Sequence, residues 1–167
     1  EHFNVFATKG NLNNHIGVPL SILSIGNDIE IAVIEMGANH QKEIELLCSI
    51  AQPTHGLISN VGMAHLEGFG GFEGVKKGKA ELYAYLSAND GYVFVNAPNA
   101  DLMEMVGKSA AKNIVHYNVT EPKAAYGILK HSDPLIDFEW TFEASTHAAK
   151  ANLTGTYNFE NILAAIS

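Results

Sequence analysis

The sequence predicts an α/β fold, in which a mostly parallel sheet flanked by helices carries a small antiparallel β appendage. Up to about residue 120, short β-branched runs alternate with amphipathic segments, which is typical of strands that alternate with helices. After residue 120, apolar and polar residues alternate without an intervening helical pattern. The 167 residues, 47% hydrophobic and 17% charged, suit one domain with its own core.

The first half of the chain begins the alternation of strands and helices. The run Ile31–Glu35 is expected to be a buried parallel strand, because β-branched residues follow one another there without polar alternation. Pro19 suits the first position of a helix that reaches about Ile25, since a proline N–H is not needed there. An amphipathic helix at Glu43–Ala51 should end before Pro53. The strands expected in this half are 3–7, 31–35 and 55–60.

The second half continues the pattern and then departs from it. Phe72–Leu86 is the longest predicted helix, and Ala100–Val106 is a shorter one. The alternation at Ile136–Phe142 predicts an antiparallel strand with one face in water. The remaining strands are expected at 91–96, 113–117, 124–129 and 149–153. We therefore divide the chain into an α/β core (1–120), a β appendage (121–155) and the start of a helix (156–167).

Composition excludes several classes of protein. All ten basic residues are lysines and the formal net charge is -8, so no basic surface for nucleic acid is expected. No apolar run approaches the ~18 residues of a membrane span. The single Cys48 excludes an internal disulfide and suits a reducing compartment, and no Cys/His pair has the spacing of a zinc site. We expect a cytoplasmic monomer, cut from a longer protein because the chain lacks a starting Met and ends within a helical pattern.

Three predicted strands end in a polar residue, namely Glu35, Asn60 and Asn96. One such residue most often forms a turn, but ligands of open α/β sheets bind beyond these strand ends, so three together indicate a site. Glu35 directly follows four apolar residues. Its carboxylate must therefore stay neutral, pair with a cation or helix N-terminus, or bind a metal such as Mg²⁺.

Lys79 shares a predicted helix face with Val75, Leu82, Tyr83 and Leu86. Such a lysine usually extends its amine to water. Alternatively, burial lowers its pKa, and the neutral amine can add CO₂ to form an anionic carbamate that binds metal. A loop histidine such as His65 most often lies at the surface. From the residues alone, the chain is an α/β domain with an anion or Mg²⁺ crevice.

Five strings together resemble the central ATPase domain of the Mur ligase family, which has a P-loop NTPase-like fold. The resemblance covers nearly the whole chain, although no phosphate-cradling G-x-x-x-x-G-K-[ST] string occurs in it. The strings are T-K-G-N-L-N-N-H-I-G-V-P (8–19), I-E-M-G-A-N-H (34–40), S-N-V-G-M-A-H-L-E-G-F-G (59–70), K-A-E-L-Y (79–83) and G-T-Y-N-F-E-N (155–161).

The resemblance implies ATP and two Mg²⁺ ions as cofactors. Glu35 would hold the ion that bridges the ATP phosphates, while His65 and a carbamylated Lys79 would hold the second ion, beside the substrate carboxylate. The residues that would contact or shape the nucleotide site are Asn60, Asn96, Asn158 and Asn161, although the last two could instead cap a helix. The residues that would lie near the second substrate are Thr8, Asn11, Asn14, Asn39 and His40.

The activity implied is ATP-dependent amide ligation through an acyl phosphate in peptidoglycan synthesis. The strings at 11–19 and 35–40 are similar to the branch that joins D-alanyl-D-alanine to UDP-N-acetylmuramoyl tripeptide. The phosphate loop and the amino- and carboxyl-terminal domains would lie outside this chain, so the chain alone is expected to be inactive. Alternatives are a folylpolyglutamate synthetase-like ligase of the same superfamily and a nucleotide-binding or scaffold module without catalysis.

Overall fold

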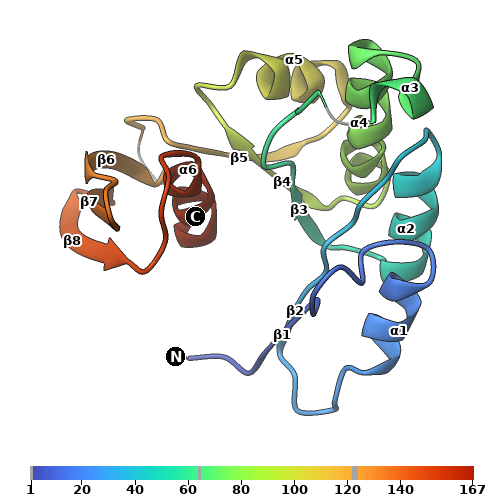
Figure 1. The fold of residues 1–167 in the computed structure, drawn as a ribbon, viewed down its shortest axis with the longest axis horizontal. Coiled ribbons are helices and arrows are strands. Elements are labelled where there is room, and N and C mark those ends of the chain that lie inside the picture. The colour runs from blue at the N-terminus through green and yellow to red at the C-terminus, as the bar shows by residue number, and fades with distance from the viewer. Residues whose placement is uncertain (1, 64, 122–123) are drawn as a thin grey trace.

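The α/β part of the molecule contains two small parallel sheets with helices along one side (Figure 1). The computed structural model describes residues 2–63, 65–121 and 124–167. β1 (Val5–Ala7) pairs with β2 (Ile31–Val33), and a second sheet has the order β3 (His55–Leu57), β4 (Tyr92–Asn96), β5 (Asn113–Tyr117). The helices are α1 (Gly17–Leu23), α2 (Glu43–Ala51), α3 (Leu66–Phe69), α4 (Phe72–Ala88) and α5 (Ala100–Lys108).

The helices form a continuous row, whereas the strands do not. α1 contacts α2, α2 contacts α4, and α4 contacts α5. Within the described residues, however, β2 and β3 are not hydrogen-bonded to each other, and the sheet is interrupted between them. α2 thus connects the two sheets and lies beside the interruption.

Two apolar clusters hold the helices in place, because burial of apolar surface is the main stabilising term in folding. One joins α4 and α5 to the central strand β4, around Tyr83, Val93 and Leu102. The other joins α1 to α2, around Val18 and Leu47. The carboxyl ends of the strands emerge beside the first turns of these helices, where polar loops replace the apolar core.

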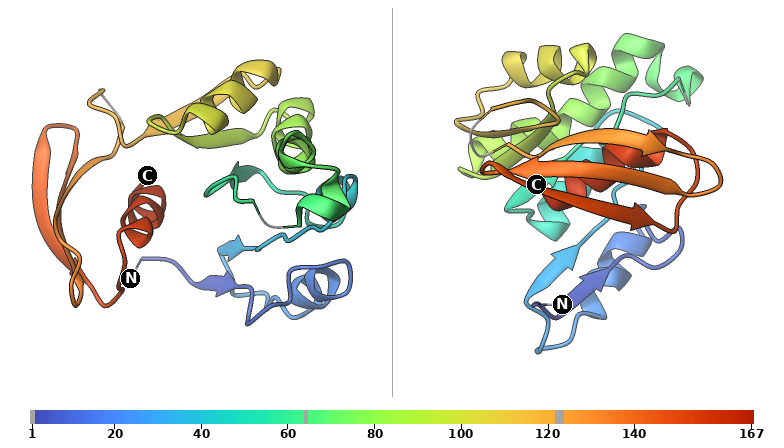
Figure 2. Two further views of the ribbon diagram at one scale, coloured as in Figure 1. Left: turned by 45° about the horizontal axis from the view of Figure 1, so that its top comes forward. Right: turned by 90° about the vertical axis from the view of Figure 1, so that its left-hand side faces the viewer.

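The antiparallel appendage forms a separate layer from β6 (Tyr126–His131), β7 (Ile136–Phe142) and β8 (Ser145–Ala151). α6 (Tyr157–Ile166) lies between this sheet and the α/β part (Figure 2). The Phe159 ring packs edge-on against Phe138, with 5.7 Å between centroids. Gly127 permits the close approach, since an added Cβ would lie 2.6 Å from a Leu163 methyl group. Positions 122–123 of the expected appendage lie outside the described residues.

The expected fold class is confirmed, but several local predictions are wrong. The strand expected at 55–60 ends at Leu57, and the one expected at 149–153 spans Ser145–Ala151. The strand at 31–35 ends at Val33 and is not buried, since Ile31 and Val33 are 41% and 56% exposed. Its side chains lack cover because β2 pairs only with β1 in the described part of the chain. Pro19 is the third residue of its helix rather than the first, which is tolerated because first-turn N–H groups have no partner within a helix.

Candidate functional site

The loop that follows β2 holds Glu35 in a defined orientation. Asn13 Nδ2 donates a hydrogen bond to Glu35 Oε1 at 2.7 Å, and the Glu35 N–H donates to Thr8 Oγ1 at 2.9 Å. The Gly37 N–H in turn donates to the Asn13 carbonyl at 2.8 Å. Such bonds to a carboxylate orient it toward a metal ion. Asn13 is not among the site residues that the sequence predicts, although it stands between Asn11 and Asn14 in the N-L-N-N string.

The other polar residues of the first loop shape the backbone. Asn14 Oδ1 accepts the N–H groups of Ile16 and Gly17 at 3.0 and 2.9 Å, which caps the start of α1. The Thr8 hydroxyl is engaged by Glu35, as described above. Asn11 is exposed. The structure therefore gives Thr8 and Asn14 supporting contacts and leaves the Asn11 side chain in solvent.

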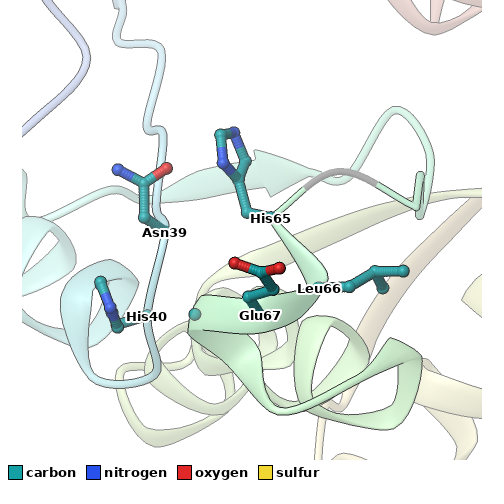
Figure 3. Close-up of a pocket in the computed structure, with 6 residues that line it drawn as sticks. Asn39, His40, His65, Leu66 and Glu67 are labelled. Carbon is teal, nitrogen blue, oxygen red and sulfur yellow. The ribbon is translucent and has the colours of Figure 1, made fainter.

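A cavity of about 440 Å³ lies where the loop after β2 meets the loop before α4. Figure 3 shows Asn39 and His65 extending to the same side from these two loops, with Glu67 nearby. Gly68 allows the loops to touch, because an added Cβ would lie only 2.3 Å from the Asn39 carbonyl oxygen. The lining residues are Asn39, His40, His65, Leu66, Glu67 and Gly68.

The corner formed by Asn39 and His40 is fixed by Glu43, in the first turn of α2. Glu43 Oε2 accepts the backbone N–H of Asn39 at 2.6 Å and that of His40 at 3.0 Å. These hydrogen bonds, that from Asn39 first, lower the pKa of the Glu43 carboxyl. Two predicted substrate residues thus border the cavity on a rigidly held turn.

Lys79 reaches the loop that follows β3. Its Nζ donates to the Asn60 carbonyl oxygen at 2.7 Å, and burial lowers the pKa of this amine. The structure therefore joins Lys79 to Asn60 through the backbone of Asn60, while the Asn60 side chain is not part of that bond. The direction of the pKa shift is the one that a reactive neutral amine requires.

Lys76, which the sequence does not single out, is more deeply buried than Lys79. It is 7% exposed, and its Nζ contacts Asp101 at 3.0 Å and also contacts Glu104. The hydrogen bonds that Lys76 Nζ donates to Glu104 and, second, to Asp101 raise the pKa of this amine. The partners lie on α5, so helix periodicity within α4 could not reveal them.

The four asparagines predicted for the nucleotide site have different surroundings. Asn96 is 1% exposed; its Nδ2 donates to Glu160 at 3.1 Å and its Oδ1 accepts from Asn118 at 3.3 Å. It therefore braces β4 against α6. Asn158 Nδ2 donates to the Thr154 carbonyl at 2.8 Å, and Asn161 Nδ2 approaches Asn158 Oδ1 at 3.4 Å. Asn158 and Asn161 lie together at the start of α6, which is far along the sequence from the Lys79–Asn60 contact.

The pair His65 and Lys79 suits Mg²⁺ only if Lys79 becomes an anion, whereas the Glu35 carboxylate already offers oxygen ligands. No cluster of three His, Cys, Asp or Glu side chains is arranged to hold a metal in the described ranges. The predicted trio contributes only Glu35 and His65 of these types, and a carbamate on Lys79 would add the oxygen ligands that Mg²⁺ prefers. In the same ranges, no helix is long and apolar enough to cross a bilayer.

Comparison with known proteins gives a consistent result. Residues 1–167 match the family model of the Mur ligase middle domain. The UDP-N-acetylmuramoyl-tripeptide--D-alanyl-D-alanine ligase of Escherichia coli (strain K12) is 34% identical over 164 residues, covering 97% of this chain and 36% of that protein. Its counterpart from Synechocystis sp. is 32% identical over 164 residues, covering 98% of this chain and 34% of that protein.

Solved structures agree. MurF from Acinetobacter baumannii superposes with a TM-score of 0.86 at 29% identity, over 99% of this chain and 36% of that one. MurF ligase from Thermotoga maritima in complex with ADP gives 0.78 at 29% identity, over 99% of this chain and 38% of that one. The chain thus spans about a third of the length of the relatives it matches.

Proposed function

The chain belongs to the Mur ligase middle-domain family, and from this we propose that it is the ATP- and Mg²⁺-binding middle of a cytoplasmic ligase. The ligase would join D-alanyl-D-alanine to UDP-N-acetylmuramoyl tripeptide through an acyl phosphate. The observation that carries the proposal is the partly buried Lys79 amine, held by the Asn60 carbonyl in the loop between β3 and α3 that also bears His65. The structure of a relative in complex with ADP supports the proposal that this chain binds a nucleotide.

The interrupted sheet supports a larger domain than these 167 residues. The row α1, α2, α4, α5 is continuous, yet β2 and β3 do not pair with each other and β2 has exposed apolar side chains. Parallel strands are normally buried between layers. We propose that a further strand of the ligase fills this interruption and leads into the phosphate loop, and that the 1–120, 121–155 and 156–167 parts act with separate amino- and carboxyl-terminal domains.

The three proposed metal ligands would hold two Mg²⁺ ions. Glu35, oriented by Asn13, would hold one Mg²⁺, and His65 with the Lys79 carbamate would hold the other. Bound Mg²⁺ offsets the mutual repulsion of the phosphates and the substrate carboxylate. To form the carbamate, the neutral Lys79 nitrogen bonds to the carbon of CO₂ and one amine proton leaves to solvent. The remaining N–H can still donate to the Asn60 carbonyl oxygen.

The remaining polar residues of the candidate site fall into those that would contact a ligand and those that would support the site from behind. Asn39 and His40 line the cavity and would meet the muramoyl substrate, as would the exposed Asn11 of the first loop. Thr8 and Asn14 would act through the backbone and through Glu35. Near the nucleotide, Asn60, Asn158 and Asn161 would make contacts, while Asn96 would support the pocket from its buried position.

The test uses the intact ligase with ATP, Mg²⁺, D-alanyl-D-alanine and UDP-N-acetylmuramoyl tripeptide, and follows ADP and the peptide product. Lys79→Ala should nearly abolish ligation, because a metal ligand is lost, and short carboxylates should restore part of it. Lys77→Ala, on an exposed position of the same helix, is the matched control. Full activity of Lys79→Ala would contradict the proposed role of Lys79. A loss of activity that short carboxylates do not restore would contradict the proposal that Lys79 carries a carbamate.

A further inference from the structure

The start of α2 lacks a cap from its own sequence. The residue that precedes the helix is Lys42, whose backbone is left-handed with φ of 73° and whose side chain makes no capping bond. A lysine side chain has no acceptor for the free N–H groups of a first helical turn. Some other group must therefore satisfy these donors.

Glu81, on α4, supplies the missing acceptors. Its Oε1 accepts the Lys42 N–H at 2.6 Å, and its Oε2 accepts the Glu45 N–H at 3.0 Å. Both oxygens of one partly buried carboxylate are thus used at the first turn of a helix that is remote in sequence. A negative charge at this end of a helix is also favourable, because the free N–H groups carry partial positive charge.

The start of α2 is connected to the cavity by a second carboxylate. Glu43 follows Lys42 and accepts the N–H groups of Asn39 and His40. The contacts therefore run without a break from α4, through Glu81 and the first turn of α2, to the corner that borders the cavity. Lys79 stands two residues before Glu81 on the same helix.

We propose that Glu81 is a positioning residue, which fixes the Asn39–His40 corner relative to Lys79 by holding the start of α2 against α4. The link to ligation rests on the proposed function, whereas the link to the corner rests on the contacts alone. If the Asn39–His40 corner binds the muramoyl substrate, displacement of the corner should impair the reaction but should not weaken the binding of ATP.

The experiment compares Glu81→Ala and Glu81→Gln in the intact ligase. Glutamine keeps the shape and one acceptor, so it remains informative if the alanine variant does not fold. The matched control is Glu45→Gln, which removes the same charge at the same junction, since the Glu45 side chain bonds Lys42 at the surface and only its backbone meets Glu81. Kinetic constants are normalised to folded enzyme, and amide hydrogen exchange is followed by mass spectrometry.

For Glu81→Ala, kcat/KM for UDP-N-acetylmuramoyl tripeptide should fall by about 10- to 100-fold, the scale of a small misplacement of reacting groups. For Glu81→Gln, kcat/KM should fall less. The KM for ATP should stay within about twofold of the parent value in both Glu81 variants. Amides 39–45 should exchange faster, whereas Glu45→Gln should behave as the parent. A loss of thermal stability with unchanged kinetics of the folded enzyme would overturn the positioning role.

The two proposals can fail separately. If the parent ligase does not join the substrates, the proposed function fails, and the exchange of amides 39–45 still decides whether Glu81 holds the corner. Unchanged exchange in both Glu81 variants would overturn the inference even in an active ligase.

Discussion

Two lysines three positions apart on α4 illustrate how strongly the partner decides the chemistry of a residue. Lys79 meets a neutral carbonyl, and burial lowers its pKa. Lys76 meets carboxylates of α5, and they raise its pKa despite its deeper burial. An amine of the first kind can react as a nucleophile, while one of the second kind stays charged and joins helices.

The ion pairs of Lys76 lead to a prediction for stability against pH. Lys108 and Lys76 lower the pKa of the Glu104 carboxyl to about 2. A carboxyl with a depressed pKa in the folded state stabilises the fold above its unfolded pKa, and this stabilisation disappears as the pH falls through the folded value. Glu104→Gln should therefore be less stable than the parent at pH 7, and should lose less stability between about pH 5 and pH 2.

Urea unfolding of the two proteins at several pH values measures this difference. Glu45→Gln, which removes a carboxylate from an exposed pair on α2, serves as the control. Parallel stability curves for Glu104→Gln and the parent from pH 7 to pH 2 would show that the pairs of Glu104 with Lys108 and Lys76 do not stabilise the fold.

At the scale of single elements, α2 shows how a helix can begin at an unfavourable residue. Lys42 adopts a left-handed conformation that glycine accepts without strain, and it does so where the chain turns from the cavity into the helix. The contacts of Glu81 and Glu43 hold the chain in this conformation. The strain at Lys42 is thus offset by the backbone hydrogen bonds that the carboxylates of Glu81 and Glu43 accept.

Two substitutions at this position separate strain from charge. Lys42→Ala and Lys42→Gly both remove the surface pair with Glu45, but only glycine relieves the positive φ. We expect the glycine variant to exceed the alanine variant by about 1 kcal/mol in free energy of unfolding, as the cost of a left-handed L-residue implies. Chemical denaturation of both gives the value, and an alanine variant as stable as the glycine variant would refute the assignment of strain.

For the whole molecule, the arrangement of sheets determines what the chain can do alone. The chain spans only about a third of the length of its relatives, and the described strands leave an interruption where β2 and β3 do not pair. The antiparallel layer and α6 stand beside the α/β part and contact it through Asn96 and Glu160 (Figure 2). Under the proposed function, a complete site would therefore include residues from outside this chain.

The 167-residue chain by itself should not hydrolyse ATP above the rate of a buffer blank. The reason is that no glycine-rich phosphate loop of the G-x-x-x-x-G-K-[ST] type occurs in its sequence, so backbone N–H groups to cradle the phosphates are missing. Phosphate release by the purified chain, with the intact ligase as the positive control, measures this. Sustained turnover by the chain alone would show that the phosphates are bound by residues described above.

The sequence by itself determined the α/β class, the antiparallel appendage, Asn96 as the polar end of β4, and the unusual position of Lys79, whereas Glu35 and Asn60 lie in the loops after β2 and β3. These follow from periodicity and from residue types within single segments, which local physical chemistry controls. Only the tertiary structure decided that Asn13 orients Glu35, that Asn96 is a buried brace, that Lys76 pairs with α5, and that Glu81 caps α2. Each of these contacts joins residues at least 22 positions apart, in one case 64, and no pattern within one helix or strand encodes which distant segment will pack beside it.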